Sequence, residues 1–146
     1  MNLEHYQLKA GEGLVSFEFV SVRPKGLIPK LIYFTATNYP GLHNLSFGDK
    51  DLKTGKLDDL AVSDNGDTDR VLATVVAAVY AFTDRYPDAW VAATGSTDAR
   101  TRLYRMGISK YFGKVNSDFY ILGQSNNAWE PFVVGKDYEA FVVKRK

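Results

Sequence analysis

The chain has 146 residues, of which 45% are hydrophobic, 14% aromatic and 24% charged, and this composition predicts one globular domain spanning residues 1–146. The formal net charge is only +1, so no global field would draw the protein to nucleic acid or to an anionic membrane. The absence of cysteine excludes disulfides, thiolate catalysis and zinc ribbons. With no signal-peptide pattern and no apolar run near the ~20 residues of a membrane span, we expect a soluble, cytoplasmic protein.

Three strands are predicted in the first third of the chain. Residues 14–22 alternate apolar and polar side chains with the two-residue period of a strand. Leu31–Thr35 is apolar on both faces and is expected to be a central strand, and Leu42–Phe47 alternates again. Turn signals separate the three segments, at Pro24-Lys25-Gly26 and at Asn38-Tyr39-Pro40-Gly41.

The middle of the chain predicts a long loop followed by a long helix. Residues 48–66 are polar and rich in Asp, Lys and Gly, and they form the longest candidate loop. Asp67 or Thr68 is expected to cap a helix that runs to about Arg85 and ends before Tyr86-Pro87-Asp88. Its inward stripe follows the helical period at Val71, Val75, Val79 and Phe82.

The last third predicts a buried parallel strand at residues 90–94, then a helix over Thr97–Met106 closed by Gly107 in the C′ position. One further helical turn is expected over Ile108–Phe112. Strands are expected at 119–122, 130–134 and 138–143, with turns between them at Ser125-Asn126-Asn127 and Gly135-Lys136-Asp137. The order βββ-α-β-α-βββ predicts an α+β fold, with a mixed, largely antiparallel sheet and two main helices.

The strongest candidate site lies where the second predicted helix begins. There a strand stops, Gly95 permits a tight turn, and Ser96 and Thr97 precede the helix. Backbone N–H groups at a helix N-terminus attract anions, and Arg100 offers a planar donor pair suited to phosphate. Tyr104 follows Arg100 by four residues and shares its helical face. We therefore predict an anion pocket made by these five residues.

A purely structural interpretation of the same segment stays open. Ser96 or Thr97 can serve as an N-cap and nothing more, and Asp98 opposes a bound anion. The arginines of the helix can pair with the acidic residues Asp58, Asp59, Asp64 and Asp67. The helical period places Ala99, Leu103 and Met106 toward the core, and Arg102 and Arg105 toward solvent.

Other chemistries have weaker patterns. The Asp-rich segments lack the ligand spacing of a calcium loop, so we expect no metal site. His5 and His43 stand near no serine elbow, which disfavours a hydrolytic triad. Trp129, two residues before Pro131, is expected to be an exposed contact, which is a feature of a protein–protein interaction module or a homo-oligomer.

The segment Gly95-Ser96-Thr97-x-x-Arg100-Thr101-Arg102-Leu103-Tyr104-Arg105, preceded by Val71–Val75, resembles a family of small bacterial proteins with a domain of unknown function. That resemblance covers nearly the whole chain and implies no activity. The binding hypothesis is a phosphate-bearing ligand, either a nucleotide or RNA, in a toxin–antitoxin or defence setting.

A second resemblance, to the GNAT acetyltransferases, implies an alternative. Leu103-Tyr104 and Gly107-Ile108 look like the Leu-Tyr and Gly-aromatic pairs of that family's last helix. The resemblance implies that Tyr104 protonates the departing CoA thiolate. The spacing from Tyr104 to Gly107 is one residue shorter than in the family. Where the pyrophosphate loop is expected, the chain has Ser63-Asp64-Asn65-Gly66-Asp67. CoA is thus implied only if the protein is an acyltransferase.

Overall fold

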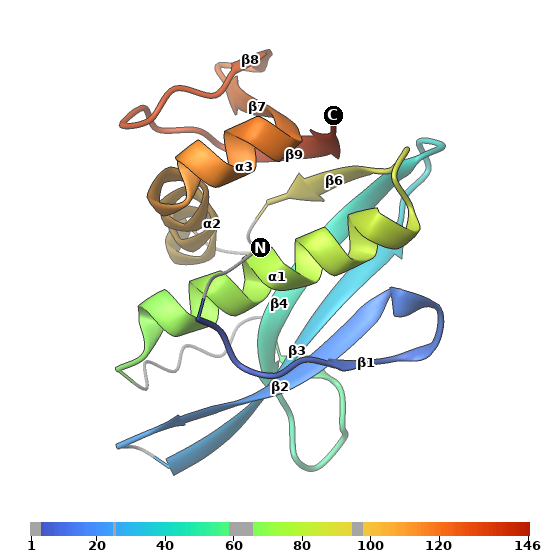
Figure 1. Cartoon of the computed structure of the whole chain (residues 1–146), viewed down its shortest axis with the longest axis vertical. Coiled ribbons are helices and arrows are strands. Elements are labelled where there is room, and N and C mark those ends of the chain that lie inside the picture. The colour runs from blue at the N-terminus through green and yellow to red at the C-terminus, as the bar shows by residue number, and fades with distance from the viewer. Residues whose placement is uncertain (1–3, 25, 59–65, 95–97) are drawn as a thin grey trace. The chain divides into compact units, whose positions relative to one another are not determined.

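The computed structural model describes residues 4–24, 26–58, 66–94 and 98–146. The chain divides into two compact units (Figure 1). Unit 1 comprises residues 1–34 and 46–85, and unit 2 comprises residues 35–45 and 86–146. The prediction of one domain over residues 1–146 stays a prediction.

Unit 1 combines antiparallel strands with one long helix. Its elements are β1 (Lys9–Ala10), the 3-10 helix η1 (Glu12–Leu14), β2 (Ser16–Arg23), β3 (Gly26–Ala36), the second half of β4 (Leu42–Lys50), β5 (Leu57–Asp58) and α1 (Thr68–Arg85). The hydrogen-bonded order is β1-β2-β3-β4, with β5 paired to β4. The strand predicted over Leu31–Thr35 is therefore interior, because β3 has a neighbour on each side.

The core of unit 1 is aromatic. Phe34 of β3 stacks on Phe82 of α1 with 4.2 Å between ring centroids, and Phe17 and Phe19 point inward from β2. The predicted helix 68–85 is confirmed. Asp67 is its N-cap, since the Asp67 carbonyl accepts the first helical hydrogen bond, from the Val71 amide at 3.0 Å.

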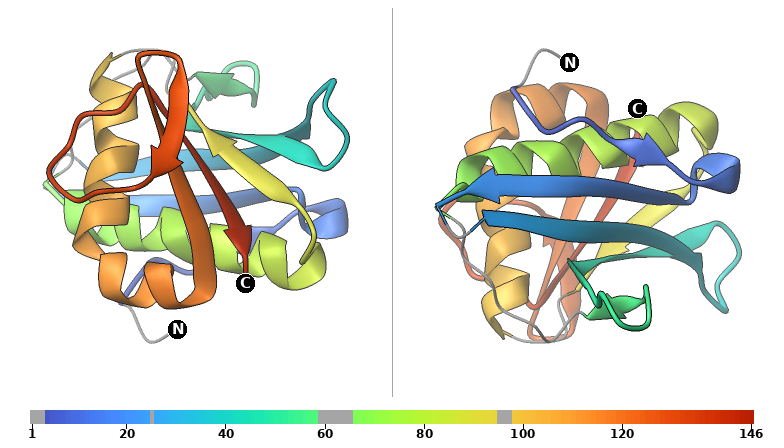
Figure 2. Two further views of the ribbon diagram at one scale, coloured as in Figure 1. Left: turned by 90° about the horizontal axis from the view of Figure 1, so that it is seen from above. Right: turned by 90° about the horizontal axis from the view of Figure 1, so that it is seen from below.

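Unit 2 has the strand order β4-β6-β9-β7-β8, with β4 contributing its first half. The other elements are β6 (Trp90–Ala93), α2 (Asp98–Lys110), α3 (Phe112–Asp118), β7 (Phe119–Ser125), β8 (Ala128–Pro131) and β9 (Ala140–Arg145). β6 pairs parallel with β4, as predicted, and antiparallel with β9. The left view of Figure 2 shows β6, β9 and β7 as neighbouring ribbons.

One face of the unit 2 sheet is covered and apolar. Phe119 and Ile121 of β7 and Phe141 of β9 are buried on it. Phe112, at the start of α3, reaches this core through Phe132, whose ring lies 5.8 Å from Phe112 and also 5.8 Å from Phe141. The helices therefore take up one face of this sheet, and the alternate residues of each strand lie on the opposite face.

The β7–β8 hairpin turns on Asn126 and Asn127, which have φ values of 53° and 64°. Positive φ at both central residues is the geometry of a type I′ turn, which asparagine tolerates. The predicted turn at Ser125-Asn126-Asn127 is confirmed. The turn pairs Gln124 with Trp129 and Gly123 with Glu130.

The α+β class and the mixed, largely antiparallel sheet are confirmed: in the strand pairs whose register is described, only β4 with β6 is parallel. The loop predicted over 48–66 is wrong in its first part. β4 continues to Lys50, and Asp49 pairs with Asp58 in a hairpin closed by β5. Residues 59–65 of that prediction lie outside the described residues. The strand predicted over residues 14–22 is β2, which starts only at Ser16, because Leu14 belongs to η1.

Two predictions on the helices of unit 2 are also wrong. Gly107 is a buried interior residue of α2, which ends at Lys110, and the Gly107 carbonyl accepts a hydrogen bond from the Tyr111 amide at 3.2 Å. Helix α3 follows after one residue and was not predicted beyond Phe112. None of the helices in the described ranges is long and apolar enough to cross a membrane.

Candidate functional site

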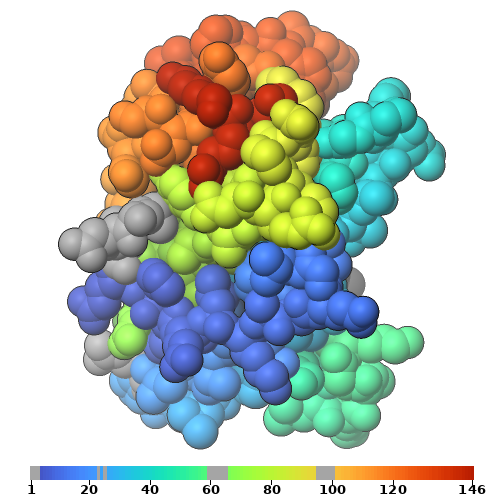
Figure 3. Space-filling model, turned by 45° about the vertical axis from the view of Figure 1, so that its right-hand side comes forward, coloured from blue at the N-terminus to red at the C-terminus, as the bar shows by residue number. Residues whose placement is uncertain are grey.

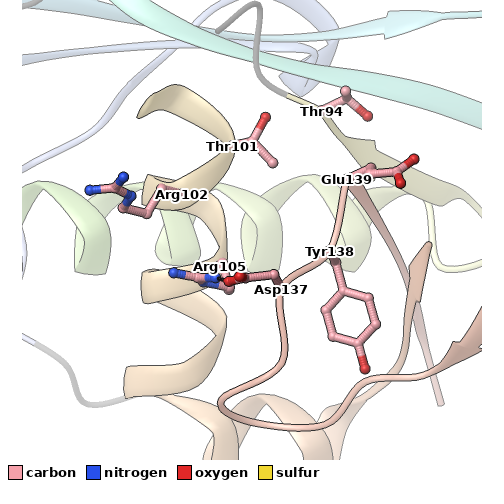
Figure 4. A pocket seen from close by; sticks show the side chains of 7 residues that line it. All are labelled: Thr94, Thr101, Arg102, Arg105, Asp137, Tyr138 and Glu139. Carbon is pink, nitrogen blue, oxygen red and sulfur yellow. Dashed lines mark ion pairs between the residues drawn. The ribbon is translucent and has the colours of Figure 1, made fainter. Parts of the chain in front are cut away.

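An open cavity of about 610 Å³ lies in unit 2 beside α2. Its walls come from the residue after β6, from the first turns of α2 and from the loop that enters β9 (Figure 4). The lining residues are Thr94, Thr101, Arg102, Arg105, Asp137, Tyr138 and Glu139. The volume is within the range of small-molecule sites, which is roughly 300–1,000 Å³.

Helix α2 supplies the basic side of the cavity. Thr101 and Arg105 are four residues apart and share one helical face. Arg102 makes no ion pair with a residue that the structure describes, and it is exposed. Arg105, predicted to point outward, is 28% exposed and forms an ion pair with Asp137 at the surface of the cavity. Met106, predicted to face the core, is instead 42% exposed, and its neighbours Tyr104 and Gly107 are buried.

The loop before β9 supplies the acidic side. Arg105 and Asp137 point toward one another and form an ion pair (Figure 4). The Asp137 side chain is 90% exposed, so this pair is a surface salt bridge that contributes about 1 kcal/mol or less. The Glu139 carboxylate accepts a hydrogen bond from the Asn126 amide at 3.4 Å. The cavity thus combines two guanidinium groups with two carboxylates that solvent can reach.

Tyr138 fixes the acidic loop. It is buried, and its ring points away from Thr94 and Glu139 (Figure 4). The ring lies against Gly123 of β7, where an added Cβ would stand 2.5 Å from a ring carbon. The Tyr138 hydroxyl oxygen also accepts a hydrogen bond from the Val133 amide at 3.0 Å. A buried aromatic anchor therefore holds the two carboxylates that flank it in the chain.

The five predicted site residues are only partly described. Gly95, Ser96 and Thr97 lie outside the described residues, and of Arg100 only the helical backbone in α2 is described. Tyr104 is buried, and it is not among the described residues that line the cavity. The anion pocket predicted from these five residues therefore stays a prediction. The cavity is nevertheless built on the same segment, from Thr94 to Arg105.

Sequence reasoning missed Asp137 and Glu139 as site residues. The only local signal was the turn at Gly135-Lys136-Asp137, which the positive φ of Gly135, 92°, confirms. Asp137 and Glu139 lie near α2 only because of tertiary contacts between residues more than 30 positions apart. The predicted pairing of arginines with Asp58, Asp59, Asp64 or Asp67 is replaced, for Arg105, by Asp137. Asp59 and Asp64 lie outside the described residues.

Within the described ranges, no group of three or more His, Asp or Glu side chains is arranged to hold a metal ion. Trp129 is 46% exposed, as predicted for a contact residue.

The chain is thus an α+β protein with a mixed-charge cavity between a helix and a loop of unit 2. The model of the family of unknown function DUF6934 matches residues 2–146, and the chain belongs to that family. Neither a curated protein nor a solved structure matches the chain.

Proposed function

We propose that the cavity beside α2 binds a small phosphate-bearing ligand of the nucleotide class. The observation that carries the proposal is that Arg102, Arg105, Asp137 and Glu139 line one open cavity of about 610 Å³. Guanidinium groups bind phosphate through planar pairs of donors. Carboxylates accept hydrogen bonds from ribose hydroxyls and exocyclic amines. A nucleotide presents both kinds of group.

The mixed charge favours a nucleotide over inorganic phosphate or a long RNA. Formal charges of the lining residues cancel, and tight RNA binding depends on several uncompensated phosphate contacts. The exposed Arg105–Asp137 pair can open at small energetic cost, which frees the Arg105 guanidinium for a phosphate. On the basis of the sequence pattern, we include three further hydrogen-bond donors near the start of α2 in this proposal: Ser96, Thr97 and Arg100.

The test is an amide-shift titration with AMP, ATP, pyrophosphate, CoA and adenosine, each at up to millimolar concentration. We expect AMP and ATP to move amides of residues 101–105 and 137–139, with adenosine weaker. A charge-assisted hydrogen bond contributes roughly 1.5–3 kcal/mol, so Arg102→Ala and Arg105→Ala should each weaken binding about ten- to a hundredfold. Arg100→Ala tests the sequence-based part in the same way.

Lys53→Ala is the matched control, because it removes an exposed cation from the β4–β5 hairpin in unit 1. If none of the phosphate compounds moves these amides, the proposal is wrong. If CoA alone moves them and Tyr104 also shifts, the GNAT-like acyltransferase alternative replaces it, with Tyr104 as the proton donor. Tyr104 is buried, so proton donation from its hydroxyl to CoA would require α2 to move.

A further inference from the structure

The face of the unit 2 sheet opposite its helices carries three aromatic residues, one each from β6, β7 and β8. The pairing register aligns Trp90 of β6, Lys144 of β9 and Tyr120 of β7 in one row across three adjacent strands. Strands lie about 4.8 Å apart, so the two rings are separated by about 10 Å with a lysine between them. We call the surface that contains this row the outer face.

Both tryptophans of the chain lie on the outer face. The chain has two tryptophans, and Trp129 of β8 pairs with Gln124, which alternates onto the same side of β7 as Tyr120. Tyr120 is 55% exposed and Trp129 is 46% exposed. Large aromatic side chains at such exposure are costly to leave in water, so a cluster of them indicates an interaction site. In the left view of Figure 2, neither α2 nor α3 lies in front of β7 and β9.

The charged side chains that the strands place on the outer face are all positive. Lys144 lies between the two rings, and the Lys146 ammonium stands 5.6 Å from the centroid of the Tyr120 ring. Glu130, the acidic residue of these four strands, pairs with Gly123 and therefore projects to the other side. In Figure 3, atoms of β9 (dark red) reach the surface beside those of the segment that contains β6 (yellow).

We propose that the outer face binds single-stranded nucleic acid, with bases stacked on Tyr120, Trp90 and Trp129 and phosphates at Lys144 and Lys146. A single strand offers flat rings and anions in alternation, which matches the order of ring, lysine and ring in the row. A protein partner with an apolar surface would bury Lys144 without a counter-charge, which is costly. In a duplex the bases are already stacked and paired with one another, so they are not available to stack on these side chains.

The first measurement is the intrinsic tryptophan fluorescence of the full chain during titration with a 12-nucleotide single-stranded RNA of mixed sequence. Because both tryptophans lie on the outer face, we expect stacking to quench most of their emission. Fluorescence anisotropy of the labelled RNA gives the Kd. Two lysines predict a shallow salt dependence, with log K falling with log salt at a slope of about −1.4 for a single strand. The duplex of the same sequence should bind more weakly.

Substitutions then locate the site. Loss of one base–aromatic stack by alanine substitution should raise the Kd roughly 5- to 150-fold for Tyr120→Ala or Trp129→Ala. Leu52→Ala is the control, because it removes a large hydrophobic side chain that is 79% exposed in the turn between β4 and β5 of unit 1. Lys144→Gln and Lys146→Gln should each reduce the salt slope by about 0.7, whereas Lys114→Gln on α3 should leave it unchanged.

Arg102→Ala separates this proposal from the nucleotide cavity. It should weaken AMP binding and leave RNA binding and tryptophan quenching unchanged, so either proposal can fail alone. Absence of binding and quenching at 100 μM protein overturns the outer-face proposal, as does equal binding of the duplex. A concentration-dependent dimer that Trp129→Ala dissociates, without an RNA effect, overturns it in favour of a protein interface. Circular dichroism verifies that each variant folds.

Discussion

In unit 1 the Asp67 carboxylate is buried and accepts hydrogen bonds from the hydroxyls of Tyr6 and of Ser21, the latter at 2.5 Å. In unit 2 the Asp137 carboxylate is almost fully exposed and pairs with Arg105. The two groups have the same chemistry. Burial makes the first a fixed part of the fold, whereas exposure leaves the second free to exchange its partner for a ligand.

The same contrast extends beyond these two carboxylates. Around Asp67, the guanidinium of Arg70 lies 4.3 Å from the centroid of the Tyr6 ring. Elsewhere in unit 1, Lys30 is buried and pairs with Asp49 at 2.6 Å. In unit 2 the charged residues line an open cavity, and aromatic rings stand on an accessible sheet face. Polar groups of unit 1 are therefore expected to determine stability, and those of unit 2 to determine binding.

The largest expected effect is on the stability of unit 1. Asp67→Ala removes the charged acceptor of two buried hydroxyls, and each such hydrogen bond contributes roughly 1.5–3 kcal/mol, so the free energy of unfolding should fall by about 3–6 kcal/mol. Urea denaturation followed by circular dichroism measures this. Asp69→Ala, at the same helix end but exposed, should cost less than about 1 kcal/mol. Equal losses in the two variants would show that burial of Asp67 is not the cause.

The next largest effect joins stability and binding in unit 2. In Gly123→Ala the new methyl group would meet the Tyr138 ring at 2.5 Å, and overpacking of this kind costs about 1–3 kcal/mol. The displaced ring should also move Asp137 and Glu139 and weaken nucleotide binding. Gly113→Ala is the control: it lies in α3 with no atom near the added Cβ. It should stabilise the protein by about 0.5–1 kcal/mol. A neutral Gly123→Ala would contradict the proposed anchoring.

Substitution in the cavity should affect binding far more than folding. Arg105→Ala removes an exposed ion pair, so the free energy of unfolding should change by less than about 1 kcal/mol. The affinity for AMP should fall about ten- to a hundredfold. Thermal melts and titration calorimetry on the same preparation compare the two. A large loss of stability without a loss of affinity would make Arg105 a structural residue and remove the distinction between the units.

The smallest expected effect concerns the ion pair between Lys136, in the loop before β9, and Glu130 of β8. A hydrogen bond to the Glu130 carboxylate raises the pKa of Lys136 above its usual 10.5. Because the pKa of Lys136 is higher in the folded than in the unfolded chain, the pair stabilises the fold fully at a pH below the unfolded-state pKa. This stabilisation is lost as the pH rises through the folded-state pKa. An NMR titration of the lysine side chain should therefore show a lower midpoint for Lys136 in Glu130→Gln. An unchanged midpoint would mean that the hydrogen bond is absent in solution.

The sequence predicts the elements of unit 1 best where one period dominates. Helix α1 follows from its helical apolar period and clear end signals, whereas only the central part of β3 was predicted, at Leu31–Thr35, and the strand begins five residues earlier, at Gly26. Gly107 misled the prediction of α2, because glycine marks a helix end only when its φ is positive, and here it fills a buried interior position. The β4–β5 hairpin was not predicted, because its residues are mostly polar and polar composition indicates a loop. An exposed hairpin can consist of the same residues.

The candidate site was predicted to within a segment but not to its residues. The strand-to-helix junction before α2 lies on the segment that lines the cavity, at Thr94 and Thr101, although the predicted anion pocket itself stays a prediction. The acidic wall could not be inferred, because Asp137 and Glu139 reach α2 only through tertiary contacts anchored by Tyr138. The row of Trp90, Lys144 and Tyr120 likewise requires the register of three strands.

The two-residue turn at Asn126-Asn127 sets which side of the sheet Trp129 occupies. Side chains alternate along a strand, so one residue inserted into this turn and taken up by a shift of β8 would exchange the sides of Trp129 and Glu130. The outer face would then lose a ring and gain a carboxylate without any change to the residues themselves. The length of the hairpin, as much as its composition, therefore encodes the character of this surface.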